Sequence, residues 1–117
     1  MMRAHLIILA CLALPGIASA EACRTVHGRM SLANGAPTVR IWVIGSNRVL
    51  GVVQQNERFD DLPANVRRIW AADGDDAMWR SDLFGHFRVC AVTPSRPGRM
   101  QLVSLKAASD LRRSARN

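Results

Sequence analysis

The sequence predicts a small all-β fold: an antiparallel β-sandwich with one disulfide and one short helical insertion. Several segments alternate apolar and polar residues, which is typical of strands with one buried face. Short turns that contain glycine, asparagine or proline separate these segments. Two cysteines, Cys23 and Cys90, follow the N-terminal apolar run. In an oxidising compartment such a pair is most simply one disulfide.

Residues 1–20 have the pattern of a secretory signal peptide. Arg3 precedes an apolar run from Leu6 to Leu14, and Ala18-Ser19-Ala20 offers the small residues of a cleavage site. The run is shorter than the roughly 20 apolar residues that span a bilayer. We therefore expect cleavage after Ala20, a periplasmic or secreted protein, and no stable membrane span in the mature chain.

The rest of the chain is long enough for one domain, which we expect over residues 21–105. Residues 24–32 predict the first strand, because Val26, Gly28, Met30 and Leu32 share one face. Turn signals at 34–35 and 45–47 then delimit strands at 39–44 and 48–53. This spacing indicates hairpin-connected antiparallel strands.

Residues 54–80 interrupt the strand pattern and predict a loop and helix insertion. Asp61 is placed to cap a helix that has Pro63 in its first turn and ends at Gly74. The aspartates at 73, 75 and 76 lack the continuation of a calcium-binding loop, so we interpret them as a polar turn.

The chain returns to strands after the insertion. Residues 81–85 predict a turn that leads into a strand ending near Val92, with Phe87 and Val89 on one face and His86 and Cys90 on the other. A proline-rich turn at 93–98 precedes a closing strand at 99–105. We expect residues 106–117 to form a basic C-terminal tail, either a short helix or a frayed end.

Three of these segments resemble carboxypeptidase regulatory-like domains, which belong to the transthyretin-like (prealbumin-like) β-sandwiches. S-D-L-F-G-H-F at 81–87 is similar to their T-D-x-x-G-x-F signature. Residues 26–42 resemble the opening pair of strands of that family, and P-G-R-M-Q-L-V at 97–103 resembles the closing strand. An independent sandwich of immunoglobulin-like topology remains an alternative.

The resemblance implies a binding or scaffolding domain more than an enzyme, since such folds host many functions. Its hydrolase and dioxygenase relatives use tyrosines in their active sites, and this chain contains no tyrosine. We therefore predict a non-enzymatic protein without a cofactor. An unrecognised hydrolase is the weakest alternative, because no nucleophile can be identified beside a histidine.

The chain carries a formal net charge of +7. For an exported protein this charge favours an anionic envelope polymer or a protein partner, whereas scattered arginines without aromatic-flanked basic patterns argue against nucleic acid. The sequence does not predict the oligomeric state. We expect the insertion to be part of the contact surface, and its candidate binding residues are Arg58, Arg67, Arg68, Trp70, Trp79 and Arg80.

A cross-strand histidine pair supports the main alternative, a periplasmic metal-binding protein. If the disulfide joins directly opposed residues of two antiparallel strands, the same register places His27 opposite His86 and Thr25 opposite Arg88. Opposed imidazoles favour zinc or copper. Two ordinary surface histidines are the simpler interpretation, because no third ligand is marked by spacing.

Overall fold

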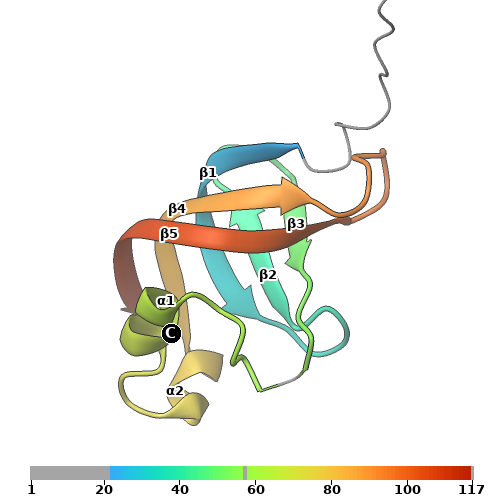
Figure 1. Ribbon diagram of the computed structural model, residues 1–117. Helices are drawn as coiled ribbons and strands as arrows, with labels where there is room; N and C mark the ends of the chain where they lie inside the picture. The colour runs from blue at the N-terminus through green and yellow to red at the C-terminus, as the bar shows by residue number, and fades with distance from the viewer. Residues whose placement is uncertain (1–21, 57, 117) are drawn as a thin grey trace, which may run out of the picture.

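Five strands and two short helices make up the fold (Figure 1). The computed structural model describes residues 22–56 and 58–116, so the predicted signal peptide lies outside the described residues. The elements are β1 Cys23–Leu32, β2 Val39–Val43, β3 Val49–Val52, α1 Ala64–Trp70, α2 Asp75–Trp79, β4 Ser81–Ala91 and β5 Gln101–Ala115. The predicted all-β class, with one disulfide and a short helical insertion, is confirmed.

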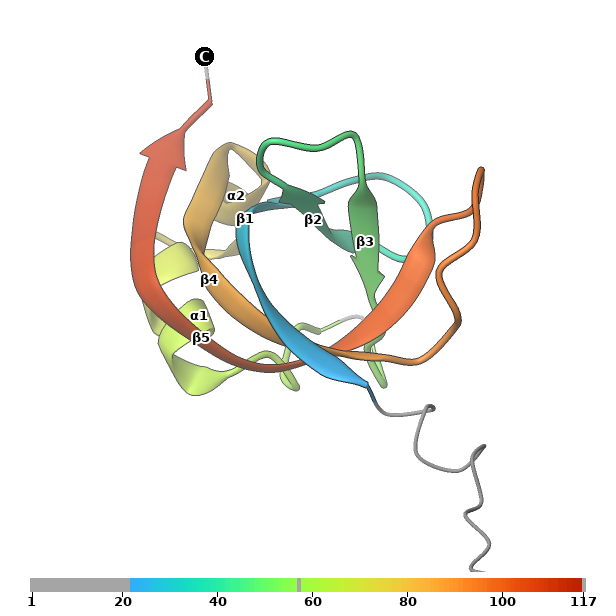
Figure 2. The ribbon, with the colours of Figure 1, turned by 90° about the horizontal axis from the view of Figure 1, so that it is seen from above.

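The strands form one closed barrel in the order β1-β2-β3-β5-β4, and β4 pairs with β1 to complete it. Figure 2 shows the five strands arranged in a ring. Neighbours are antiparallel except β3 and β5, which are parallel. The sheet is therefore closed on itself, where the sequence predicted two stacked sheets of a sandwich.

Long, bent strands account for this closure. β1 pairs through residues 23–30 with β4 and through residues 28–32 with β2, so its middle serves both neighbours. Gly28 lies in that shared stretch, where a Cβ atom would come within 2.5 Å of Ile41 Cγ2 and 3.3 Å of the Phe87 ring. The absence of a side chain lets Ile41 and Phe87 pack directly against the β1 backbone at this point.

The expected C-terminal tail is instead most of β5, and this corrects the prediction for residues 106–117. Strand β5 runs from Gln101 to Ala115 and pairs with β4 along nearly its whole length. The same pairing corrects the turn predicted at 81–85, because Ser81 to Phe84 lie opposite Arg112 to Ala115. The residue types of these two segments give only a weak strand signal. They form strands because β4 and β5 are hydrogen-bonded to each other.

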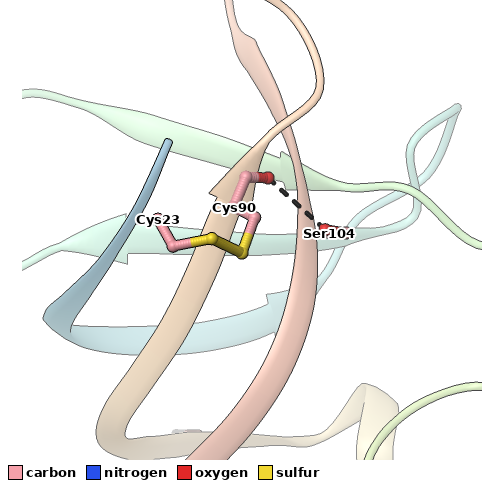
Figure 3. Close-up of a disulfide and its surroundings, with 3 residues drawn as sticks. All are labelled: Cys23, Cys90 and Ser104. Carbon is pink, nitrogen blue, oxygen red and sulfur yellow. Dashed lines mark hydrogen bonds between the residues drawn. A yellow bond between two sulfur atoms is a disulfide. The ribbon is translucent and has the colours of Figure 1, made fainter. Parts of the chain in front are cut away.

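The predicted disulfide joins Cys23 at the start of β1 to Cys90 near the end of β4 (Figure 3). The two residues are direct partners in the sheet, with Cα atoms 3.9 Å apart. Ser104 of β5 donates a 3.5 Å hydrogen bond to the Cys90 carbonyl. The register predicted from this pair is confirmed, because His27 faces His86 and Thr25 faces Arg88.

The helix predicted between Asp61 and Gly74 forms only over α1, and α2 follows Gly74 as a second short helix. Gly74 has φ 97° and separates α1 from α2. The Asp61 carboxylate does not cap α1, because it accepts a 2.7 Å hydrogen bond from the backbone N–H of Gln55. Pro63 is the N-cap residue of α1 and precedes its first turn. No helix among residues 22–56 and 58–116 is long and apolar enough to cross a membrane.

The insertion packs against one end of the barrel, and its apolar residues join the barrel's core. Leu62, Val66, Trp70 and Met78 belong to the same buried cluster as the inward residues of the strands. Trp70 is fully buried and donates a hydrogen bond of 3.3 Å to the Ser81 carbonyl. In Figure 1 the helices lie at the lower left and the β4–β5 connection at the upper right.

Candidate functional site

The structure divides the six predicted binding residues among four environments, one of which is the buried core. Arg58, Arg67 and Arg68 line one surface hollow of about 410 Å³, which we call the helical hollow. Arg80 lies in a different hollow, beside Arg113. Trp79 is 40% exposed.

The prediction for Trp70 is wrong, because this last residue of α1 is fully buried and cannot contact a partner. Trp70 lies four positions after Val66, and this spacing places both side chains on the buried face of α1. The indole contributes to the core instead.

Carboxylates offset the charge of the helical hollow. Asp60 and Asp75 line it together with the three arginines. Arg67 also donates a 3.3 Å hydrogen bond to the Asp60 carbonyl. Over residues 58–82 the chain has four basic and six acidic residues, so this region as a whole is not a positive surface.

The remaining barrel segments have the opposite balance. Residues 22–56 and 83–109 contain no aspartate or glutamate. They contain eight basic residues: Arg24, Arg29, Arg40, Arg48, Arg88, Arg96, Arg99 and Lys106. The positive charge of the described chain is therefore concentrated on the barrel strands and on the loops away from the helices.

Three of these arginines gather at one hollow, which we call the arginine hollow. It has a volume of about 600 Å³ and is formed by the β2–β3 turn and the β4–β5 loop. Arg48 comes from the turn, and Arg96 and Arg99 come from the loop. The other lining residues are Asn47, Val49, Ser95, Pro97, Gly98 and Met100.

The β2–β3 side of the arginine hollow is held by a hydrogen-bonded turn. Ser46 Oγ donates to the Val43 carbonyl at 2.7 Å and accepts from the Arg48 amide at 3.0 Å. Trp42 Nε1 donates to the Ser46 carbonyl at 2.7 Å. These bonds fix the backbone from which the Arg48 side chain extends.

The β4–β5 side is fixed at the base of its loop. The Leu102 amide donates to Thr93 Oγ1 at 2.9 Å, and the buried Gln101 donates to the Thr93 carbonyl at 3.0 Å. Arg48 then connects the two sides, because its guanidinium donates a 2.6 Å hydrogen bond to Ser95 Oγ.

A tight turn brings the two loop arginines together. Gly98 has φ 76°, a left-handed conformation that favours glycine, and the Arg99 amide donates to the Arg96 carbonyl at 3.2 Å. Guanidinium groups offer forked donors that match phosphate and carboxylate oxygens. The arrangement is suited to holding an anion.

The predicted histidine pair forms a second cluster, on the outer face of β1 and β4. The rings of His27 and His86 are stacked with centroids 5.0 Å apart. Asp110 of β5 places Oδ2 at 3.1 Å from His86 Nδ1. Within the described part of the chain, no group of three or more histidine, cysteine, aspartate or glutamate side chains is arranged to hold a metal ion.

Sequence reasoning missed Arg48, Arg96, Arg99 and Asp110. The distribution of acidic residues could have indicated the three arginines. A count by segment shows that the insertion holds most of the acidic residues, so the net positive charge lies elsewhere in the chain. No comparable signal marks Asp110.

No family model matches the chain, and neither a curated protein nor a solved structure is found to be similar to it.

Proposed function

We propose that the protein is a non-enzymatic binding module whose arginine hollow holds anionic groups of an envelope component. One observation carries this proposal. Arg48, Arg96 and Arg99 surround one hollow, and neither of the barrel segments that supply them contains a carboxylate. A phosphate or carboxylate there would meet guanidinium donors without competition from an acidic neighbour in those segments.

The barrel architecture supports a binding role by analogy. A five-stranded barrel with this strand order and helices between the third and fourth strands has the architecture of the OB-fold, whose members bind ligands through loops that include the β4–β5 connection. The arginine hollow uses that connection here. The analogy concerns the fold alone and names no ligand.

Export is part of the proposal. The disulfide fits an oxidising compartment, and the pattern of residues 1–20 is that of a cleaved leader. The anions that such a protein meets are phosphorylated lipid head groups and acidic polymers of the envelope. We propose this class of ligand ahead of a protein partner.

The residue types around the arginine hollow support binding more than catalysis. They offer guanidinium, amide and hydroxyl groups. Among the residues that line it, none is an imidazole, a thiol or a carboxylate that would serve as a general base or activated nucleophile. The hollow can orient an anion but lacks a group to transfer its protons.

Salt elution from phosphocellulose tests the proposal with charge-matched variants. The triple variant Arg48→Gln, Arg96→Gln, Arg99→Gln should elute at clearly lower salt than the wild type, because it loses the clustered donors. The matched control Arg58→Gln, Arg67→Gln, Arg68→Gln removes the same charge from the helical hollow and should shift elution less. Sedimentation with lipopolysaccharide should rank the three proteins in the same order.

Equal shifts for the two triple variants would mean that net charge alone causes retention, and the arginine hollow would lose its role. A larger shift for the Arg58, Arg67 and Arg68 variant would return the contact surface to the insertion. Circular dichroism on all three proteins checks that the exposed substitutions leave the fold intact.

A further inference from the structure

A three-residue cluster on the barrel wall has no part in the proposed anion site. His27 of β1 and His86 of β4 are direct partners in the sheet, and their rings lie against each other on the exposed face. Asp110 of β5 lies beside His86. Three neighbouring strands thus each contribute one side chain, two of them imidazoles that can ligate a metal ion and one a carboxylate that can orient an imidazole.

A β-bulge delivers the Asp110 carboxylate to this cluster. The pairing of β4 with β5 shifts between Phe84 and His86, which leaves Asp110 and Leu111 without direct partners at that point. Asp110 has φ 54°, a left-handed conformation that is uncommon for residues other than glycine. Bulges commonly re-aim a side chain in this way.

Gly85 makes room for this bulge. A Cβ atom on Gly85 would lie 2.7 Å from Leu111 Cδ2 and 2.9 Å from the Ser109 carbonyl oxygen. A larger residue at position 85 would push the bulged backbone away. The glycine, the left-handed aspartate and the shift in register therefore combine to place one carboxylate oxygen 3.1 Å from His86 Nδ1.

We propose that His27 and His86 bind a divalent transition-metal ion, zinc or copper, and that Asp110 orients His86 for this role. When Nδ1 of His86 donates to Asp110, its Nε2 is left with a free lone pair. A carboxylate that holds the outer nitrogen of a ligating histidine is a recurrent feature of metal sites, because it fixes the ring and raises its basicity.

The separation of the rings fits a shared ion. With metal–nitrogen bonds of about 2.05 Å, two imidazole centroids lie about 5.2 Å apart on a tetrahedral ion, and about 4.5 Å apart at neighbouring square-planar positions. The observed 5.0 Å lies between these values. Rotation of the His27 ring about χ2, which is a broad torsion for histidine, would turn its nitrogen toward an ion on Nε2 of His86, while His86 keeps its contact with Asp110 and the strands stay in place. Water would complete the coordination.

Charges of both signs lie near the histidine pair. Arg29, two residues after His27, is turned toward Asp82 at 3.8 Å and lies over the Trp42 ring at 4.9 Å. Arg88 is on the same face, and Asp110 supplies an opposing negative charge. Imidazole is a favoured ligand for both zinc and copper, and copper should bind more tightly.

Isothermal titration with zinc chloride and copper chloride tests the site, using protein purified without a histidine tag. We expect one ion per chain, with affinity at least tenfold lower in His27→Ala and in His86→Ala. Asp110→Asn should weaken binding about tenfold, as changes to outer partners of ligating histidines typically do. Thr25→Ala, on the same strand and face, is the matched control and should bind like the wild type.

Electron paramagnetic resonance of the copper-loaded protein gives an independent readout. Two imidazole nitrogens should produce nitrogen superhyperfine splitting in the wild type, and this splitting should be reduced in either histidine variant. The proposal is overturned if the wild type binds neither ion, or if His27→Ala binds as tightly as the wild type. Wild-type affinity in Asp110→Asn would remove the orienting role of Asp110 alone. None of these outcomes depends on the arginine hollow.

Discussion

The arginine hollow and the helical hollow each contain three arginines, yet they differ in what surrounds those arginines. In the arginine hollow the three guanidinium groups come from loops without an acidic residue. In the helical hollow the arginines share the surface with Asp60 and Asp75. The comparison teaches that the local carboxylates, and not the number of arginines, distinguish the charge of the two hollows.

The two ends of the barrel also differ in what stabilises them. The helical end is packed with buried apolar side chains, of which Trp70 is the largest. Toward the other end, Cys23 and Cys90 form a covalent link between β1 and β4, shortly before the β4–β5 loop begins. Substitutions at each end should therefore lower stability through different mechanisms.

Replacing Trp70 with alanine should have the largest effect on stability. The fully buried indole would leave a cavity and an unpaired Ser81 carbonyl, and such changes cost about 3–5 kcal/mol in free energy of unfolding. Urea denaturation measures the loss. Trp79→Ala, at a position that is 40% exposed, should cost less than about 1 kcal/mol. Similar losses for both variants would contradict the placement of Trp70 in the core.

Removing the disulfide should have the next largest effect. The double variant Cys23→Ala, Cys90→Ala opens a link between residues 67 positions apart and should lower the free energy of unfolding by about 2–4 kcal/mol. Chemical reduction of the wild type should give a similar loss in the same urea titration. Unchanged stability after either treatment would show that the link adds nothing to this barrel.

Removing the carboxylates of the helical hollow should reduce the difference between the two hollows. The double variant Asp60→Asn, Asp75→Asn should raise phosphate affinity at Arg58, Arg67 and Arg68. We expect roughly threefold per carboxylate, the effect of about 0.7 kcal/mol between unit charges ~6 Å apart in water. Titration followed by amide chemical shifts measures this gain. No change at those arginines would mean that the carboxylates are not what keeps anions away.

The sequence predicted much of the local structure for clear physical reasons. Alternation identified the inward face of β1, where Val26, Met30 and Leu32 are buried. The cysteine pair set the β1–β4 register and thereby the contact of His27 with His86. These features depend on a two-residue period and a single covalent constraint, both of which are visible in one chain.

The parts that were missed depend on pairing between distant segments. Closure of the barrel requires β3 and β5 to run parallel, and no local pattern encodes that contact. Most of β5 lacks the apolar alternation of a strand. After Val103 its residues pair with β4 but do not form a continuous buried face. The arginine hollow likewise unites Arg48 with Ser95, which are 47 positions apart.

Amide chemical shifts of the wild-type protein during titration with inorganic phosphate test the central claim most directly. Residues 46–49 and 95–100 should shift most and in a saturable way, while residues 58–75 should shift little. The largest shifts at residues 58–75, or uniform shifts over the surface, would contradict the assignment of anion binding to the arginine hollow.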